Sequence, residues 1–190
     1  MRDIRDFDVL IIPGWDDSGP DHWQTYWERA FANMRRVQQD DWRKAVFEEW
    51  SLRLSEAVLR CRKPVLLVAH SLGTSLVMRW AEVAGSGGTI AGAFLVAPTD
   101  QDLFDESESS LRGFGPMLTE PLPFPSMVLA SQNDEFVSLE RARFFAESWE
   151  SSFVNLGALG HVGSAAKLGL WPQGLVWLGQ FMGSLTAGAH

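Results

Sequence analysis

The chain has 190 residues, and its formal net charge is −8 because 24 acidic side chains outnumber 16 basic ones. The length fits one domain, and the 46% share of hydrophobic residues is enough for a sizeable core. This acidic balance argues against a nucleic-acid partner or an anionic membrane surface, since proteins that bind either usually present a basic face.

The first half of the chain alternates apolar runs with segments of helical period. The expected elements are, in chain order, a strand at 8–15, a helix at 18–34, a weak strand at 35–39, a helix at 42–60, a strand at 64–70 and a helix at 72–84. The first strand, DVLIIPGW, ends in a Pro-Gly turn. Within the segment 18–34, Pro20 is suited to the first helical position, so we expect the helix proper to begin there.

The second half continues the alternation after a GSGG loop. The expected elements are a strand at 91–98, a polar and mostly irregular stretch at 99–125, a strand at 126–131, a helix at 138–150, a strand at 152–157, a helix at 171–182 and a flexible tail at 183–190. About six strands alternating with helices, several of them apolar throughout, predict a parallel sheet with helices on both faces. We therefore expect one doubly wound α/β domain over residues 1–190.

The segment between the third strand and its helix carries the first chemical signal. Ala69-His70-Ser71-Leu72-Gly73 matches the nucleophile-elbow pattern G-x-S-x-G, with alanine in place of the first glycine. Such a turn strains its central residue and lifts the serine hydroxyl above the sheet edge. It also places the Leu72 backbone N–H at a helix N-terminus, where it can stabilise an oxyanion. A helix-capping serine is the alternative, but the position between a buried strand and a helix favours a nucleophile.

Two aspartates and one histidine follow later strands and are candidates to activate Ser71. Asp134, in SMVLASQNDEFVS, comes just after the fifth strand, whereas Asp100, in VAPTD, ends the fourth, and both are open as the acid. Of the four histidines, only His161 falls where the chain order serine, acid, histidine requires it. His161 would accept the Ser71 proton, and the aspartate would orient the imidazole and stabilise its charged form.

The turn after the first strand, PGWDDSGPDHW, is expected to complete the site. The residue after Gly14 faces the same sheet edge, so the Trp15 backbone N–H is the candidate for a second oxyanion donor. His22, Trp23 and His70 are candidates for the wall of the substrate pocket. For Trp23, core packing is an alternative of equal weight.

Five segments together resemble the small α/β-hydrolase family of YdeN and the retinoblastoma-binding serine hydrolase: IPGWDDSGPDHWQTYWE, VAHSLGTSLVMRW, FLVAPTD, PSMVLASQNDEFVSLERARFFAESWES and LGALGHVGS. The resemblance spans nearly the whole chain. It implies an α/β-hydrolase fold without a large lid domain, and a triad of Ser71, Asp134 and His161, which favours Asp134 over Asp100. Two departures are the alanine at position 69 and the lack of a polar residue soon after the histidine in GHVGS.

The leading hypothesis is a serine hydrolase, esterase-like, that cleaves a carboxylic ester, thioester or small amide through an acyl-enzyme. The alternative is a hydrolase-fold interaction protein with vestigial activity, against which the complete triad counts. A nucleotide-binding domain is poorly supported, because no G-x-G-x-x-G follows the first strand and no G-x-x-x-x-G-K-[ST] occurs. With the serine on the third strand, we predict the sheet order 2-1-3-4-5-6.

Partner, cofactor and location follow from what the sequence lacks. Cys61 is the one cysteine, and no Cys/His cluster has metal-ligand spacing, so we expect neither a metal nor a cofactor.

The N-terminus is acidic where a signal peptide would be basic, and no apolar run is long enough for a membrane helix, so we expect a cytoplasmic protein. The expected partner is a small acyl substrate; a protein partner is open. The acidic stretch DLFDESESS within 99–116 predicts that anionic substrates are disfavoured.

Overall fold

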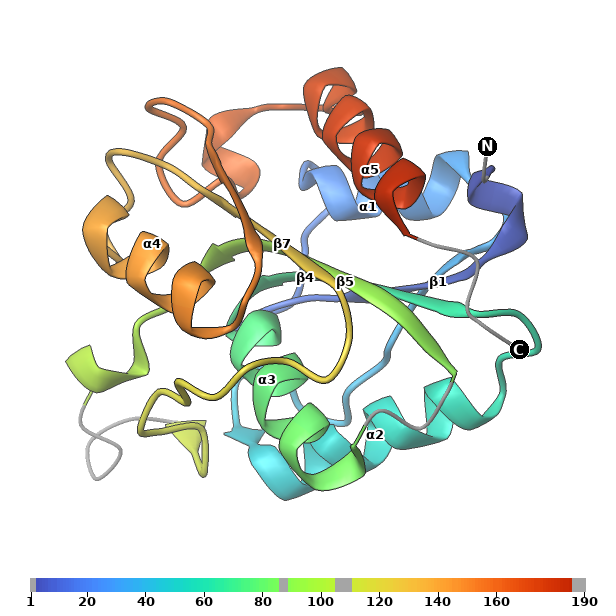
Figure 1. The fold of residues 1–190 in the computed structure, drawn as a ribbon, viewed down its shortest axis with the longest axis horizontal. Coiled ribbons are helices and arrows are strands. Elements are labelled where there is room, and N and C mark those ends of the chain that lie inside the picture. The colour runs from blue at the N-terminus through green and yellow to red at the C-terminus, as the bar shows by residue number, and fades with distance from the viewer. Residues whose placement is uncertain (1–2, 86–88, 105–110, 186–190) are drawn as a thin grey trace.

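A sheet of six parallel strands forms the centre of the computed structural model, which describes residues 3–85, 89–104 and 111–185 (Figure 1). The strands are β1 (Asp8–Ile12), β2 (Met34–Arg36), β4 (Val65–Ser71), β5 (Ile90–Pro98), β7 (Ser126–Ala130) and β8 (Ser152–Asn155). Their order is β2-β1-β4-β5-β7-β8, and every neighbouring pair is parallel. Numbered along the chain, this is 2-1-3-4-5-6, so the predicted order is confirmed.

Helices cover both faces of the sheet, as the sequence predicts. They are α1 (Trp23–Ala30), α2 (Phe47–Leu59), α3 (Leu72–Ala84), α4 (Leu139–Ser148) and α5 (Pro172–Ser184). Figure 1 shows α1 and α5 on one face, with α2, α3 and α4 on the other. Two short strands, β3 (Ala45–Val46) and β6 (Leu111–Arg112), pair apart from the main sheet. The sheet and its helices leave no separate lid domain among the described residues.

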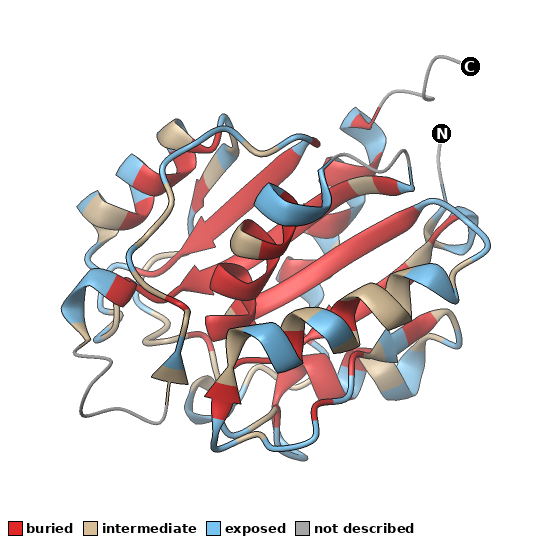
Figure 2. Cartoon of the chain, turned by 90° about the horizontal axis from the view of Figure 1, so that it is seen from below, coloured by how far each residue is buried: buried red, intermediate tan, exposed pale blue. Residues whose placement is uncertain are grey.

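The central strands supply the core, because they are buried on both faces (Figure 2). Side chains alternate along β4: Leu66 and Val68 pack with α1 and α5, whereas Leu67 and Ala69 pack with α2, α3 and α4. Fully burying each such leucine or valine contributes about 1.5–3 kcal/mol. The same alternation puts His70, the next even-numbered residue, on the α1 face.

The ends of several expected elements shift by one to four residues: the first strand ends at Ile12 and not at 15, and the first helix ends at Ala30, since Met34 already belongs to β2. Three further boundaries differ from the structure for reasons that can be named. The helix expected to start at Pro20 begins at Trp23, and His22 caps it by accepting the Gln24 N–H at 3.1 Å. The second helix begins at Phe47, because the residues before it form β3, which pairs with β6. These starts were misplaced because tertiary contacts, and not local propensity, set them.

The third difference concerns the end of the chain. The last helix runs through Ser184, so the expected flexible tail starts too early at 183. Most of the rest of that tail, at 186–190, lies outside the described residues. The same holds for part of the GSGG loop, at 86–88. Within the described ranges, no helix combines the length and apolar character needed to cross a membrane.

Candidate active site

The turn between β4 and α3 holds Ser71 in a strained conformation. Ser71 has φ 56° and ψ −129°, which L-residues other than glycine rarely adopt. Such a conformation costs about 1–3 kcal/mol and persists only where the surroundings enforce it. The strain turns the chain sharply from strand to helix, and the hydroxyl projects at the carboxyl edge of the sheet.

Two glycines let the first strand approach this turn closely. A Cβ added at Gly73 would lie 2.4 Å from the Ile12 carbonyl oxygen, and one at Gly14 would lie 2.7 Å from the Ser71 Cβ. Neither distance is sterically allowed, so both positions require glycine. The residue at position 69, where the elbow pattern has a glycine, is an alanine that is fully buried within β4.

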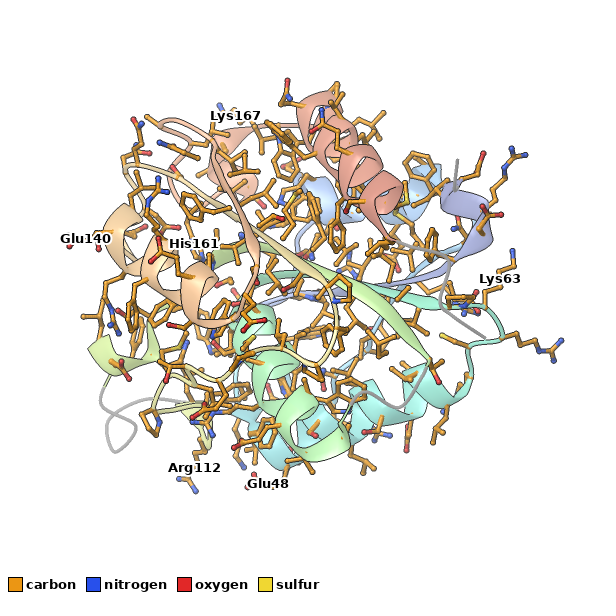
Figure 3. All side chains as sticks on the ribbon, viewed as in Figure 1. Glu48, Lys63, Arg112, Glu140, His161 and Lys167 are labelled. Carbon is orange, nitrogen blue, oxygen red and sulfur yellow. The ribbon has the colours of Figure 1, made fainter. Side chains whose placement is uncertain are left out.

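The structure brings Ser71, His161 and Asp134 together in one chain of hydrogen bonds. His161 Nε2 lies 2.7 Å from Ser71 Oγ, and His161 Nδ1 lies 2.9 Å from both carboxylate oxygens of Asp134. Ser71 ends β4, His161 follows β8 and Asp134 follows β7, and the carboxyl ends of these strands share one edge of the sheet; Figure 3 labels His161 there. The Asp134 side chain is fully buried, and that of His161 is 17% exposed.

The hydrogen-bond network assigns the proton positions in this chain. The Asp134 carboxylate can only accept, so His161 Nδ1 carries the proton that it donates to Asp134. The Nε2 lone pair then faces Ser71 and accepts its O–H. Asp134 Oδ1 also accepts the Phe136 N–H at 2.9 Å, which fixes the carboxylate. A neutral imidazole in this tautomer is ready to take a proton from Ser71.

Asp100, the other aspartate considered as the acid, is engaged elsewhere. Its carboxylate lies 2.7 Å from Arg141 Nε and 3.1 Å from Arg141 Nη2. Its Oδ1 also accepts the Asp102 N–H and so caps the short 3₁₀ turn η2 (Gln101–Leu103). The structure therefore places Asp134, and not Asp100, against His161.

Side chains in the Ser-x-Asn-Asp segment join the two loops that carry Asp134 and His161. Asn133 Oδ1 accepts the Gly160 N–H at 2.8 Å, next to the histidine. Ser131 Oγ accepts the Leu159 N–H at 2.9 Å and lies 3.1 Å from the Gly157 carbonyl oxygen. These bonds fix the position of the His161 loop relative to the Asp134 loop. They give Ser131 and Asn133 a structural role beside Asp134.

A mostly apolar cavity of about 230 Å³ opens beside the Ser71 hydroxyl. It is lined by Trp15, Ser71, Leu72, Thr99, Gln101, Phe104, Leu111, Phe136 and His161. Trp15 and Leu72, the residues expected to supply oxyanion donors, therefore lie at the cavity together with Ser71. Phe136 packs edge-on against the His161 ring at a centroid distance of 4.5 Å.

The expectation that His22, Trp23 and His70 line the substrate pocket is wrong for this cavity, since none of them borders it. All three are buried beneath the loop that carries His161. His70 Nε2 lies 2.8 Å from the His161 carbonyl oxygen, and the Trp23 indole N–H donates to the Val162 carbonyl at 2.9 Å. The physical reason is strand alternation, which turns His70 away from the Ser71 side of the sheet. His70 and Trp23 therefore hold the loop of His161 from below, and His22 packs against His70.

Burial keeps the two histidines under this loop uncharged. Desolvation lowers the pKa of His22 to about 3, with a smaller contribution from the positive charge of Arg36. Desolvation also holds the pKa of His70 well below its ordinary value. The rings pack edge-on with centroids 4.6 Å apart, so a proton on either would be poorly solvated. In the described part of the chain, no group of three or more His, Cys, Asp or Glu side chains could hold a metal ion.

Two residues next to Ser71 and His161 were not among those expected from the sequence. Thr99 Oγ1 lies 3.0 Å from Ser71 Oγ, and Phe136 packs on the His161 ring. Thr99 stands in VAPTD directly before Asp100, so a polar residue at a strand end was the available signal. Phe136 gave no signal beyond its position two residues after Asp134.

Comparison with known proteins identifies relatives of this chain. A family model described as serine hydrolase matches residues 9–180. A protein described as a YdeN-like hydrolase from Pectobacterium atrosepticum is 31% identical, with a TM-score of 0.84 over 95% of this chain and 93% of that one. None of the curated proteins compared with the chain matches it.

More distant structures share the fold. The ydeN gene product from B. subtilis is 19% identical, with a TM-score of 0.72 over 93% of this chain and 98% of that one. The type II thioesterase BorB from the borrelidin biosynthetic cluster is 17% identical, with a TM-score of 0.64 over 94% and 92%. Est1E from Butyrivibrio proteoclasticus, with ferulic acid bound, is 12% identical, with a TM-score of 0.67 over 93% and 89%.

Proposed function

Because the chain belongs to the serine hydrolase family, as its resemblance to YdeN predicted, we propose that Ser71, His161 and Asp134 are its catalytic triad. The substrate in this proposal is a carboxylic ester, a thioester or a small amide. The observation that carries it is the unbroken hydrogen-bond chain, with 2.9 Å from Asp134 to His161 and 2.7 Å from His161 to Ser71. Family membership makes the protein a hydrolase; the triad and the bond cleaved are the proposal.

The geometry supports a two-step mechanism. In the first step His161 Nε2 accepts the Ser71 proton while Ser71 Oγ bonds to the substrate carbonyl carbon. The tetrahedral intermediate then collapses, and the leaving group takes the proton from His161 as its bond to carbon breaks. In the second step His161 accepts a proton from water, the resulting hydroxyl bonds to the acyl carbon, and Ser71 leaves with that proton. Asp134 stabilises the imidazolium formed in each step.

Backbone N–H groups of Leu72 and Trp15 are proposed to bind the oxyanion. Leu72 is the first residue of α3, where helix N–H groups point outward and the helix dipole favours negative charge. The close approach of Gly14 to Ser71 brings the Gly14–Trp15 peptide beside the same hydroxyl. Two donors at the place where charge develops lower the barrier, and loss of one such donor typically costs about 10²–10³ in kcat.

The cavity supports a neutral, apolar acyl group. Its lining residues include no aspartate, glutamate, lysine or arginine. A second cavity of about 560 Å³ also borders Phe136 and His161, which gives room for a leaving group near the base. One distant structural neighbour is a thioesterase and another holds ferulic acid, so thioesters and esters are the first substrates to test.

The test is hydrolysis of p-nitrophenyl butyrate, the matching thioester and the matching anilide. We expect wild-type turnover of at least one and a loss of about 10⁴-fold or more in Ser71→Ala. Ser75→Ala is the matched control, because Ser75 is a buried serine in α3, the helix that follows Ser71, and its hydroxyl makes no hydrogen bond. Full activity in Ser71→Ala, or a folded wild type that cleaves none of the three, would overturn the proposal and favour the interaction-protein alternative.

The acidic stretch predicts a preference among acyl groups. Its last six positions, 105–110, lie outside the described residues, so the proposal stands on the sequence of this segment. We expect an ester whose acyl chain ends in a carboxylate to react more slowly than a neutral ester of equal length. Equal kcat/KM for the two esters would contradict this preference.

A further inference from the structure

The Ser71 hydroxyl has a second hydrogen-bond partner besides His161. Thr99 Oγ1 lies 3.0 Å from Ser71 Oγ, and Thr99 is only 6% exposed while bordering the cavity. Thr99 directly follows β5, the strand that pairs with β4. The two hydroxyls thus meet across neighbouring strand ends, at the atom that the proposed mechanism makes reactive.

A local irregularity in the sheet aims Thr99 at Ser71. The β4–β5 register pairs His70 with Val96 but Ser71 with Pro98, so Ala97 is the extra residue of a bulge. Ala97 has φ 47°, a conformation that alanine rarely adopts. Bulges re-aim side chains and are frequent next to active sites. Without the bulge, Ser71 would pair with Ala97, and Thr99 would lie one residue farther from Ser71 along β5.

The direction of this hydrogen bond follows from the proton positions. Ser71 has one hydroxyl proton, and the Nε2 lone pair of His161 accepts it. Ser71 Oγ can therefore only accept from Thr99, and the Thr99 O–H is the donor. We propose that Thr99 is a further catalytic residue, which donates a hydrogen bond to the nucleophilic oxygen. The inference rests on the proposed function of Ser71.

Thr99 first orients the nucleophile. A hydroxyl oxygen has four tetrahedral directions: one holds Cβ, one holds the proton that points to His161, and one lone pair accepts from Thr99. A single lone pair is left, and it is the one available to attack a carbonyl carbon in the cavity. Fixing this direction before reaction removes orientational freedom that would otherwise add to the barrier.

Thr99 also stabilises charge as the reaction proceeds. When the Ser71 proton moves to His161, negative charge develops on Oγ before its bond to carbon is complete. A hydrogen bond to a charged oxygen is about twice as strong as one to a neutral oxygen, so the bond from Thr99 gains strength in the transition state. In deacylation the same oxygen is the leaving group and regains that charge, so Thr99 assists both steps.

The experiment compares Thr99→Val with Thr99→Ser. Valine keeps the shape of threonine but removes the hydroxyl, whereas serine keeps the hydroxyl and removes the methyl group. The readouts are the second-order rate of Ser71 labelling by a fluorophosphonate and the separate kcat and KM for the best ester. We expect Thr99→Val to lower the labelling rate and kcat by about 10- to 100-fold, the range for a hydrogen bond to a charged group, with KM changed less than about threefold.

The conservative variant separates catalysis from packing. Thr99→Ser is expected to stay within about threefold of wild type in labelling and kcat, since it keeps the donor. Wild-type rates in Thr99→Val would overturn the inference while leaving the proposed function intact. Equal losses in both variants would also overturn it, because they would point to the methyl group. A folded wild type that is not labelled at Ser71 would overturn the proposed function and this inference with it.

Discussion

Asp100 and Asp134 follow neighbouring strands at one edge of the sheet, and the side chains of both are almost fully buried, with 2% and 0% exposed. They differ in the partner that each carboxylate faces. Asp100 pairs with Arg141, whose guanidinium is always charged, whereas Asp134 pairs with His161, whose imidazole can gain and lose a proton. The first pair can only hold structure, and the second can also transfer charge during a reaction.

The partner, more than the carboxylate itself, therefore decides the role of a buried aspartate here. Asp134 reaches a histidine because Asn133 and Ser131 tie its loop to the loop of His161. Asp100 reaches an arginine because α4 presents Arg141 toward the end of β5. Substitutions in the two pairs should separate activity from stability.

The largest expected effect is on activity, in Asp134→Asn. The Phe136 N–H would hold the asparagine oxygen at the Oδ1 position, so an NH2 group would replace Oδ2 beside His161 Nδ1 and disfavour the tautomer that accepts the Ser71 proton. The negative charge that stabilises the imidazolium is lost as well. We expect kcat to fall by about 10⁴-fold, the loss that this change causes in a serine-protease triad. Steady-state kinetics measures it, and Asp100→Asn is the control, expected to retain kcat within about tenfold because Asp100 does not touch the base. Equal losses of kcat in the two variants would contradict the different roles assigned to Asp134 and Asp100.

The next effect is on stability, in Arg141→Met. This change leaves the Asp100 carboxylate buried without its cation, which typically costs about 3–5 kcal/mol. Urea unfolding should show a free energy of unfolding lowered by about 3 kcal/mol, whereas Asp134→Asn should stay within about 1 kcal/mol of wild type. Arg143→Met is the control on the same helix, since Arg143 lies over the Phe153 ring and is expected to contribute about 1 kcal/mol or less. A stable Arg141→Met protein would remove the structural role assigned to this pair.

A smaller effect concerns the buried histidines under the His161 loop. Burial depresses the pKa of His22 in the folded state to about 3, below the ordinary 6.5, so below pH 6.5 the unfolded chain binds a proton that the folded chain does not. Stability contributed by this group is therefore present above pH 6.5 and is lost as the pH falls toward 3. By about pH 5 the loss amounts to about 2 kcal/mol.

His22→Asn isolates this contribution. Asparagine can still cap α1, so the helix start is kept, but the side chain no longer titrates. We expect the variant to lose less stability than wild type between about pH 6.5 and 5. The slope of the unfolding free energy against pH should be shallower by the amount that corresponds to about one fewer proton taken up on unfolding. Identical slopes would show that His22 does not stay neutral in the folded protein.

The smallest expected effect comes from Trp23→Phe. Phenylalanine keeps an aromatic ring but removes the N–H that bonds to the Val162 carbonyl, next to the base. Loosening this loop should lower kcat by about three- to tenfold. Trp27→Phe is the matched control, because its indole N–H bonds to the Leu170 carbonyl, farther along the same loop. Equal kcat in the two variants would contradict a positioning role for Trp23.

The sequence predicts the strand order and the three residues of the hydrogen-bond chain because both depend on local patterns in chain order. Apolar runs mark the strands, and Ser71, Asp134 and His161 each follow one of them. Residue patterns alone left Asp100 as a rival to Asp134, since each lies at or just beyond the end of a buried strand. The resemblance favoured Asp134, and the structure brings that residue to His161.

Other features depend on contacts that the sequence does not display. Strand alternation, applied to β4, could have placed His70 away from the cavity, with Leu66 and Val68. The contact between Thr99 and Ser71 depends on the bulge at Ala97, which has no local sequence signal. Likewise, α1 begins at Trp23 where Gln24 bonds to the Ile12 and Val68 carbonyls, and not where Pro20 would allow it.

The central claim is that Ser71 is a nucleophile activated by His161. The most direct measurement is fluorophosphonate labelling of wild type, Ser71→Ala and His161→Ala, with mass spectrometry to locate the adduct. We expect one adduct on Ser71 in wild type, none in Ser71→Ala, and labelling slowed by about 10³-fold or more in His161→Ala. An adduct on another residue, or labelling in His161→Ala as fast as in wild type, would contradict that claim.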